Sequence, residues 1–232
     1  MGSPEADVER SETGATVRVW DLPVRVFHWS LVVLVTVSWV SVENGYMRLH
    51  VWSGLALLTL LLSRIAWGFI GSTTARFADF ARGPRQALGY LRAIARGDHP
   101  HHLGHNPAGG WMVLLLLAAL LAQAVTGLFA NDGVRFNAPL SGLVSSAASD
   151  QLTQVHGTIF NGILLFVWMH VVAVMYYRFV RGENLVAAMI TGMRPVDDSA
   201  SHTGLKFVRN RWAVLSLGIA AALVWWIARG PS

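Results

Sequence analysis

The sequence contains no cysteine among its 232 residues. This absence excludes disulfide bonds, thiolate-bound iron–sulfur clusters and haem attached covalently through a C-x-x-C-H motif. Any metal must therefore be held by nitrogen, oxygen or methionine sulfur. Charged residues are also scarce, at 13% of the chain. Residues 1–17 are polar and lack the basic segment and cleavage site of a signal peptide, so we expect them to form a disordered tail.

Apolar residues, by contrast, are abundant. Hydrophobic residues make up 53% of the chain and there are 10 tryptophans, which is not the composition of a soluble domain. Five apolar runs have roughly the 17–25 residues that span a hydrocarbon core of about 30 Å. They cover residues 24–42, 49–70, 110–129, 156–180 and 213–228. The sequence therefore predicts an all-α integral membrane protein with five transmembrane helices.

Basic residues are distributed unevenly between the two sides of the predicted membrane. One side holds 14 of the 18 Lys and Arg residues. The other side holds only Arg48, Arg135 and Arg229, and Arg64 lies within the second span. The positive-inside rule then predicts a cytoplasmic N-terminus and a periplasmic C-terminus. Because the arginines are spread over several loops rather than forming one stripe, the net charge of +5 does not indicate nucleic-acid binding.

Four histidines lie near the ends of the predicted spans. His28 is at the inner end of the first span and His50 at the outer end of the second, while the fourth carries His156 outside and His170 toward the inside. Fourteen residues correspond to about 21 Å of helical rise and return to within about 40° of the same direction. We predict an outer pair, His50 with His156, and an inner pair, His28 with His170. Two such pairs suit two bis-histidine b-type haems.

Histidines in membrane helices also have other uses. A single one is often a hydrogen-bonded packing residue or part of a proton path, so a haem-free membrane anchor or proton-handling bundle stays an alternative. A short loop, DHPHHLGHNP, adds His99, His101, His102 and His105. Its composition suggests a metal tract. We interpret it as a solvated loop leading into a helix, because Asn106 and Pro107 have the chemistry of an N-cap and a first turn.

The helices that carry the histidines resemble a known family. The matching segments are VWDLPVRVFHW, LHVWSGLALLTLLLSRIAWGFIG, GHNPAGGWMVLLLLAALLAQAVTGLF and VHGTIFNGILLFVWMHVVAVMYYRFVRGENLVAAMITG. They resemble the prokaryotic cytochrome b561 family, which includes the b-type cytochrome subunits of nickel–iron hydrogenases. The resemblance implies a four-helix transmembrane bundle with two b haems, whose ligand positions fall on His28, His50, His156 and His170. A fifth span and an outer loop at 131–150 depart from that four-helix core.

Two arginines are further candidates for cofactor binding. Arg25 lies one turn before His28, and Arg64 lies toward the inner end of the second span. Haem propionates are anionic and need cationic or donor partners near the membrane surface. Arg25 could equally extend to the cytoplasmic head groups. For Arg64, which lies deeper among apolar neighbours, we favour a propionate or a quinone head group.

The resemblance implies electron transfer between a membrane quinone pool and a redox partner. We expect a periplasmic partner, either a c-type cytochrome or a hydrogenase-like enzyme, and location in the bacterial inner membrane. The chain would then be an electron-transfer protein or a subunit of a quinone-linked oxidoreductase. A stand-alone superoxide:quinone oxidoreductase is an alternative, although the outer face has few basic residues to attract superoxide. Membrane lipid surrounds the helices, and a homodimer is left open.

The predicted organisation has four parts. Residues 1–17 form a cytoplasmic tail, and residues 18–195 form the di-haem transmembrane domain. Residues 196–210 form a cytoplasmic linker. Residues 211–232 carry the additional C-terminal helix.

Overall fold

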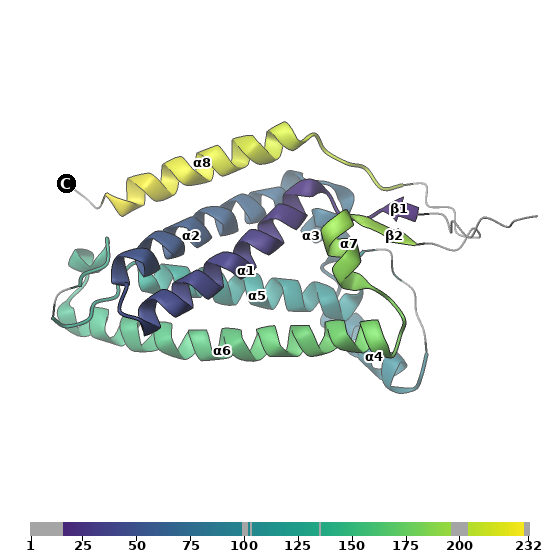
Figure 1. Cartoon of the computed structure of the whole chain (residues 1–232), viewed down its shortest axis with the longest axis horizontal. Coiled ribbons are helices and arrows are strands. Elements are labelled where there is room, and N and C mark those ends of the chain that lie inside the picture. The colour runs from purple at the N-terminus through teal and green to yellow at the C-terminus, as the bar shows by residue number, and fades with distance from the viewer. Residues whose placement is uncertain (1–15, 99–101, 103, 135, 196–203, 230–232) are drawn as a thin grey trace, which may run out of the picture.

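The computed structural model describes residues 16–98, 102, 104–134, 136–195 and 204–229. Five helices are long and apolar enough to cross a membrane. They are α1 (Leu22–Glu43), α2 (Met47–Ile70), α5 (Pro107–Gly127), α6 (Ser146–Phe179) and α8 (Asn210–Ala228). They run alongside one another in one bundle (Figure 1). The predicted all-α fold class with five membrane-spanning helices is confirmed.

Helix α2 is the centre of the bundle, since it contacts α1, α5 and α8. Helix α6 packs against α5. The buried side chains of Leu61, Leu120 and Ile163 join α2, α5 and α6, and Leu58 packs with Val224 to hold α8. Most other apolar side chains point outward, as expected where the surrounding solvent is lipid.

Two predicted features of the third span are confirmed at its start. The Asn106 side chain accepts a hydrogen bond from the Gly109 backbone N–H at 2.7 Å, and Pro107 occupies the first turn of α5. Helix α1 begins in the same way, with Asp21 accepting from the Val24 N–H at 2.9 Å. These caps satisfy backbone donors that helix geometry leaves without partners.

Helix α6 begins ten residues earlier than the apolar run at 156–180 suggested. Its first turns, SAASDQLTQV, are polar, and Ser145 caps them by accepting from the Ala148 N–H at 3.3 Å. The 34 residues correspond to about 51 Å of helix, which is longer than a hydrocarbon core of about 30 Å. The expected loop at 131–150 is consequently shorter. It contains a 3-10 turn, η2 (Ser141–Leu143), and its last residues belong to α6.

We name the two ends of the bundle by their histidines. The His50 end holds the α1–α2 turn, the α5–α6 loop and the last residues of α8. The His28 end holds several short elements that apolar runs did not reveal (Figure 1). These are β1 (Thr16–Arg18) paired antiparallel with β2 (Met193–Pro195), η1 (Thr73–Ala75), α3 (Phe77–Phe80), α4 (Pro84–Ala95) and α7 (Leu185–Thr191).

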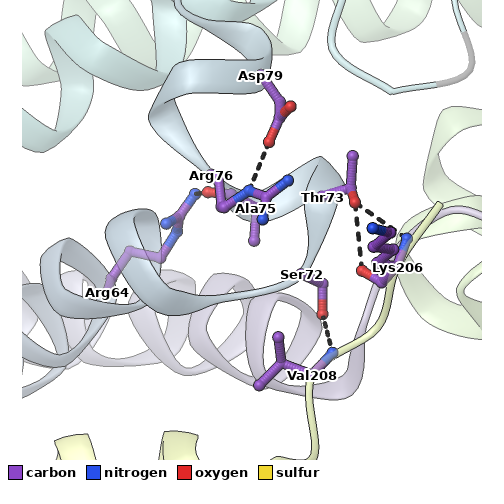
Figure 2. Close-up of polar contacts among 8 residues, drawn as sticks. All are labelled: Arg64, Ser72, Thr73, Ala75, Arg76, Asp79, Lys206 and Val208. Atoms are coloured by element: carbon purple, nitrogen blue, oxygen red, sulfur yellow. Dashed lines mark hydrogen bonds and ion pairs between the residues drawn. The ribbon is translucent and has the colours of Figure 1, made fainter. Parts of the chain in front are cut away.

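Parts of the predicted tail and linker lie outside the described residues, namely 1–15 and 196–203. Thr16 and Val17, which we had assigned to the tail, are the first residues of β1. The end of the linker is bound to η1 (Figure 2). Thr73 donates its N–H to the Lys206 carbonyl at 3.0 Å, and the Val208 N–H donates to the Ser72 hydroxyl at 3.2 Å. These bonds anchor the segment that leads into α8.

Candidate functional site

The structure brings the four predicted histidines together as two pairs. His28 of α1 faces His170 of α6, with 6.4 Å between the ring centroids. His50 of α2 faces His156 of α6, with 6.1 Å between the ring centroids. Helix α6 therefore contributes one imidazole to each pair, and the pairs lie at opposite ends of the bundle.

Both distances have a simple chemical meaning. An imidazole nitrogen binds a first-row metal at about 2.0–2.1 Å, and the ring centre lies roughly 1 Å behind that nitrogen. Two imidazoles on opposite sides of one metal ion therefore have centroids roughly 6 Å apart. Each pair is spaced to accept one ion between its rings.

At the His50 end, the second ring nitrogen of each histidine is bound to a neighbouring helix. His50 Nδ1 lies 2.9 Å from the Ser38 carbonyl and 3.1 Å from the Ser38 hydroxyl. His156 Nδ1 lies 2.9 Å from the Gln123 carbonyl and 3.3 Å from the Thr126 hydroxyl. Because a carbonyl only accepts, Nδ1 carries the proton in both rings, which leaves Nε2 as the free ligand atom.

A cavity of about 400 Å³ surrounds this pair. Its walls are mainly apolar side chains of α1, α2, α5 and α6, and His50 and His156 both line it. Glycines allow close approach here. A Cβ atom at Gly127 would lie 2.8 Å from Cε1 of His156, so any side chain at this position would push the ring away. The cavity can hold a flat apolar group with a metal at its centre.

The His28 end is different, because it gathers buried nitrogen atoms that have no hydrogen-bond partner. They are Arg25 Nε, His28 Nδ1, Arg64 Nη1 and His105 Nδ1. A buried donor without a partner costs about 1–3 kcal/mol, so four such atoms at one end indicate a site for an acceptor group.

Both predicted arginines lie at this end. The Arg64 side chain is 4% exposed, and its Nη2 donates to the Ala75 carbonyl at 3.1 Å (Figure 2). Its guanidinium carbon also lies 5.5 Å from the centroid of the Phe77 ring. Arg25 donates to the Ile190 carbonyl of α7. In each arginine another guanidinium nitrogen stays buried and unpartnered.

His105 is a site residue that the sequence interpretation missed. It is not a solvated loop residue, because its ring packs between Trp20 at 4.6 Å and Phe80 at 4.8 Å. Burial lowers the pKa of His105 to about 3, with smaller contributions from Arg64 and His170. The imidazole is therefore neutral at physiological pH. The only available signal was its position directly before the Asn106–Pro107 cap, at the boundary of a span.

His102, the other described histidine of the loop, does not join the site. His102 is exposed and its ring lies 5.4 Å from the Tyr90 ring. His99 and His101 lie outside the described residues, as do His202 and Arg135.

A hydroxyl network that the sequence did not suggest lies nearby. Tyr90 and Tyr177 hydroxyls are 2.5 Å apart, and the Asn106 amide donates to Tyr177 at 2.8 Å. This network ties α4 and the start of α5 to α6.

Comparison with known proteins finds relatives of the chain. Two relatives are each described as a "Probable Ni/Fe-hydrogenase B-type cytochrome subunit". The one from Rhizobium leguminosarum bv. viciae is 26% identical over 84% of this chain and 95% of the relative. The one from Bradyrhizobium diazoefficiens is 25% identical over 84% of this chain and 92% of the relative. No solved structure matches the chain.

The family comparison covers most of the bundle. The family model described as "Prokaryotic cytochrome b561" matches residues 19–192, which include α1, α2, α5 and α6 and leave out α8. The resemblance predicted from the sequence is thereby confirmed. The chain belongs to the prokaryotic cytochrome b561 family and is a multi-pass membrane b-type cytochrome.

Proposed function

We propose that this protein carries electrons between a membrane quinone pool and a periplasmic redox partner through two b haems. The observation that carries the proposal is the pair of facing imidazoles at each end of the bundle, 6.1 Å and 6.4 Å apart between centroids. His50 and His156 hold the outer haem, and His28 and His170 hold the inner one. When bound, each haem supplies a reversible one-electron carrier inside the membrane.

The residues of the chain fit these two groups. At the outer position, the Ser38 and Gln123 carbonyls fix the ring orientation of His50 and His156, and both rings line the mainly apolar 400 Å³ cavity. At the inner position, Arg25 and Arg64 offer unpartnered buried nitrogens to the anionic propionates. His105 Nδ1 is a further buried nitrogen without a partner at the same end.

The partner is inferred from the relatives. Both are described as cytochrome subunits of nickel–iron hydrogenases, so we assign this chain a hydrogenase-like partner. The excess of basic residues at the His28 end supports an inner-membrane orientation with that end in the cytoplasm. The partner then docks at the His50 end, beside the outer pair.

The haem-to-protein ratio of the purified full chain tests the proposal, measured as pyridine haemochrome. We expect about two haems per chain in the native protein and about one in either H50A or H170A. H102A is the matched control, since His102 lies outside both pairs and should leave the ratio unchanged. Folded protein without haem would refute the electron-transfer function. Loss of both haems from one folded single variant would refute the independent pairs.

A further inference from the structure

A second cavity lies at the His50 end, where the fifth helix meets the bundle. It has a volume of about 580 Å³ and is lined by the first turns of α2, the last residues of α8 and the α5–α6 loop. Helix α8 lies outside the segment that the family model matches. Trp225 and Arg229 therefore lie outside the matched segment.

The cavity gathers most of the positive charge of this end. Among the described residues, Arg48 and Arg229 are the only Lys or Arg at the His50 end, and both line this cavity. They come from distant parts of the sequence, so only folding brings them together. Like charges at close range repel. Asp132 is the one carboxylate in the lining, and its Oδ1 accepts the N–H groups of Val134 and Phe136. The lining keeps an excess of positive charge.

The remaining walls are apolar and aromatic. Trp52 of α2 and Trp225 of α8 line the cavity together with Val51, Leu55 and Phe136. The guanidinium carbon of Arg229 lies 4.9 Å from the centroid of the Trp225 ring, within the range at which a cation and an aromatic ring attract each other. Tryptophan and arginine at the end of membrane helices mark the level of the lipid head groups. An occupant must combine an anionic head with apolar chains.

We infer that this cavity binds an anionic phospholipid, with its phosphate between Arg48 and Arg229 and its acyl chains against Trp52 and Trp225. A quinone carries no charge that could pair with two guanidinium groups, and a soluble anion has no apolar part that could contact the apolar walls. Lipid of the leaflet at this end reaches the mouth directly. The inference is independent of the proposed electron transfer, because no residue of the lipid site is a haem ligand.

The two cavities of the His50 end are neighbours. Six residues line both of them: Met47, Val51, Leu55, Asp132, Phe136 and Pro139. A lipid in the second cavity therefore lies against the wall of the cavity that holds His50 and His156. Bound lipid would close that wall on the side of α8.

Native mass spectrometry of the full chain in detergent tests the inference, with phosphatidylglycerol as the probe and zwitterionic phosphatidylethanolamine as the comparison. The R48Q/R229Q double variant should bind phosphatidylglycerol roughly 10- to 30-fold more weakly, since a basic residue near a membrane surface contributes about 1 kcal/mol. R211Q is the matched control. It removes a guanidinium that lies 5.5 Å from a tryptophan ring at the other end of the same helix, and binding should not change.

Two further arms keep the result decisive. The R48K/R229K variant keeps both charges and should retain binding. The R229Q single variant should bind phosphatidylglycerol roughly 3- to 5-fold more weakly. A folding defect in R48Q/R229Q would not produce this graded pattern. Inorganic phosphate in excess should not displace the lipid. Equal binding by the native chain and R48Q/R229Q would overturn the inference. Displacement by inorganic phosphate would also overturn it, because the site would then be one for a free anion.

Discussion

The two histidine pairs have nearly the same spacing but opposite surroundings. At the His50 end, the second nitrogen of each ring is bonded to a helix carbonyl, at 2.9 Å in both cases, and the surrounding walls are mainly apolar. At the His28 end, His28 Nδ1 has no hydrogen-bond partner, and neither do Arg25 Nε and Arg64 Nη1. The first end fixes the rings through the protein alone, whereas the second, in the proposed function, needs an anionic ligand group to supply the missing acceptors.

This difference predicts separate sensitivities at the two ends. Changes at the His50 end should act through ring position and affect haem occupancy. Changes at the His28 end should act through charge and affect potential and pH dependence. Four substitutions test this contrast, ordered from the largest expected effect to the smallest.

Gly127→Ala should have the largest effect. Its Cβ would lie 2.8 Å from the His156 ring, so the ring must move away from its ligating position. We expect the affinity for the outer haem to fall about 10- to 100-fold, with the inner haem retained, as measured by haem content and reduced spectra. Gly218→Ala is the control, because nothing lies within 4 Å of a Cβ there. Equal haem loss in both variants would mean that any Gly→Ala change in a membrane helix lowers haem binding, and that the contact with His156 is not the cause.

His105→Phe should change how stability depends on pH. In the folded protein burial holds the pKa of His105 at about 3, below the ordinary value of 6.5. The unfolded chain therefore binds the extra proton between these values, and stability falls as the pH drops from about 7.

The slope from this residue is at most about 1.4 kcal/mol per pH unit. Phenylalanine keeps the stack on Trp20 and Phe80 without titrating, so the variant should lose less stability between pH 7 and pH 5. Thermal unfolding of the full chain measures this, with His102→Phe as an exposed control. Identical pH profiles of stability in the native protein and His105→Phe would contradict the lowered pKa of His105.

Arg64→Leu should lower the midpoint potential of the inner haem only. Oxidised haem carries one more positive charge than reduced haem, so removal of a buried cation favours the oxidised form. We expect a decrease on the order of 50 mV, compared with 59 mV for a tenfold change in a one-electron equilibrium. Redox titration followed by optical spectra resolves the two haems. Arg92→Leu, an exposed arginine of α4, is the control. A shift in the midpoint potential of the outer haem instead would contradict the placement of Arg64 beside the inner haem.

Ser38→Ala should have the smallest effect. His50 Nδ1 loses the hydroxyl at 3.1 Å but keeps the backbone carbonyl at 2.9 Å. One neutral hydrogen bond contributes about 0.5–1.5 kcal/mol. Because the carbonyl still accepts from Nδ1, we expect the low end of that range, about a 2- to 3-fold change in outer haem affinity. Thr126→Ala is the parallel change beside His156, where the hydroxyl lies at 3.3 Å. A loss as large as that of Gly127→Ala would mean that the hydroxyls, rather than the carbonyls, orient the rings.

Much of the site could be predicted because its spacing lies along single helices. The 14-residue separation of His156 and His170 sets both depth and direction, and the facing of the pairs follows from it. The boundaries of α6 could not be predicted in the same way. Apolar composition reports where a helix contacts lipid, whereas hydrogen bonding continues α6 through the ten residues before His156, six of which are polar.

The role of His105 illustrates a second limit. Four histidines in ten residues have the composition of a solvated loop, and nothing in that segment distinguishes His105 from His102. Burial of His105 depends on Trp20 and Phe80, which come from two other segments. Contacts of this kind exist only after the short elements of the His28 end have packed.

Patterns along the chain set the five spans, the uneven charge of the two ends and the depth of each histidine pair. These follow from membrane thickness and the helical period, which act along a continuous segment. Three features exist only in the folded chain: which ring nitrogens lack a partner, the packing of His105 between Trp20 and Phe80, and the cavity that Arg48 and Arg229 share. The physical reason is that these features depend on side-chain packing between segments far apart in the chain, which no local pattern encodes.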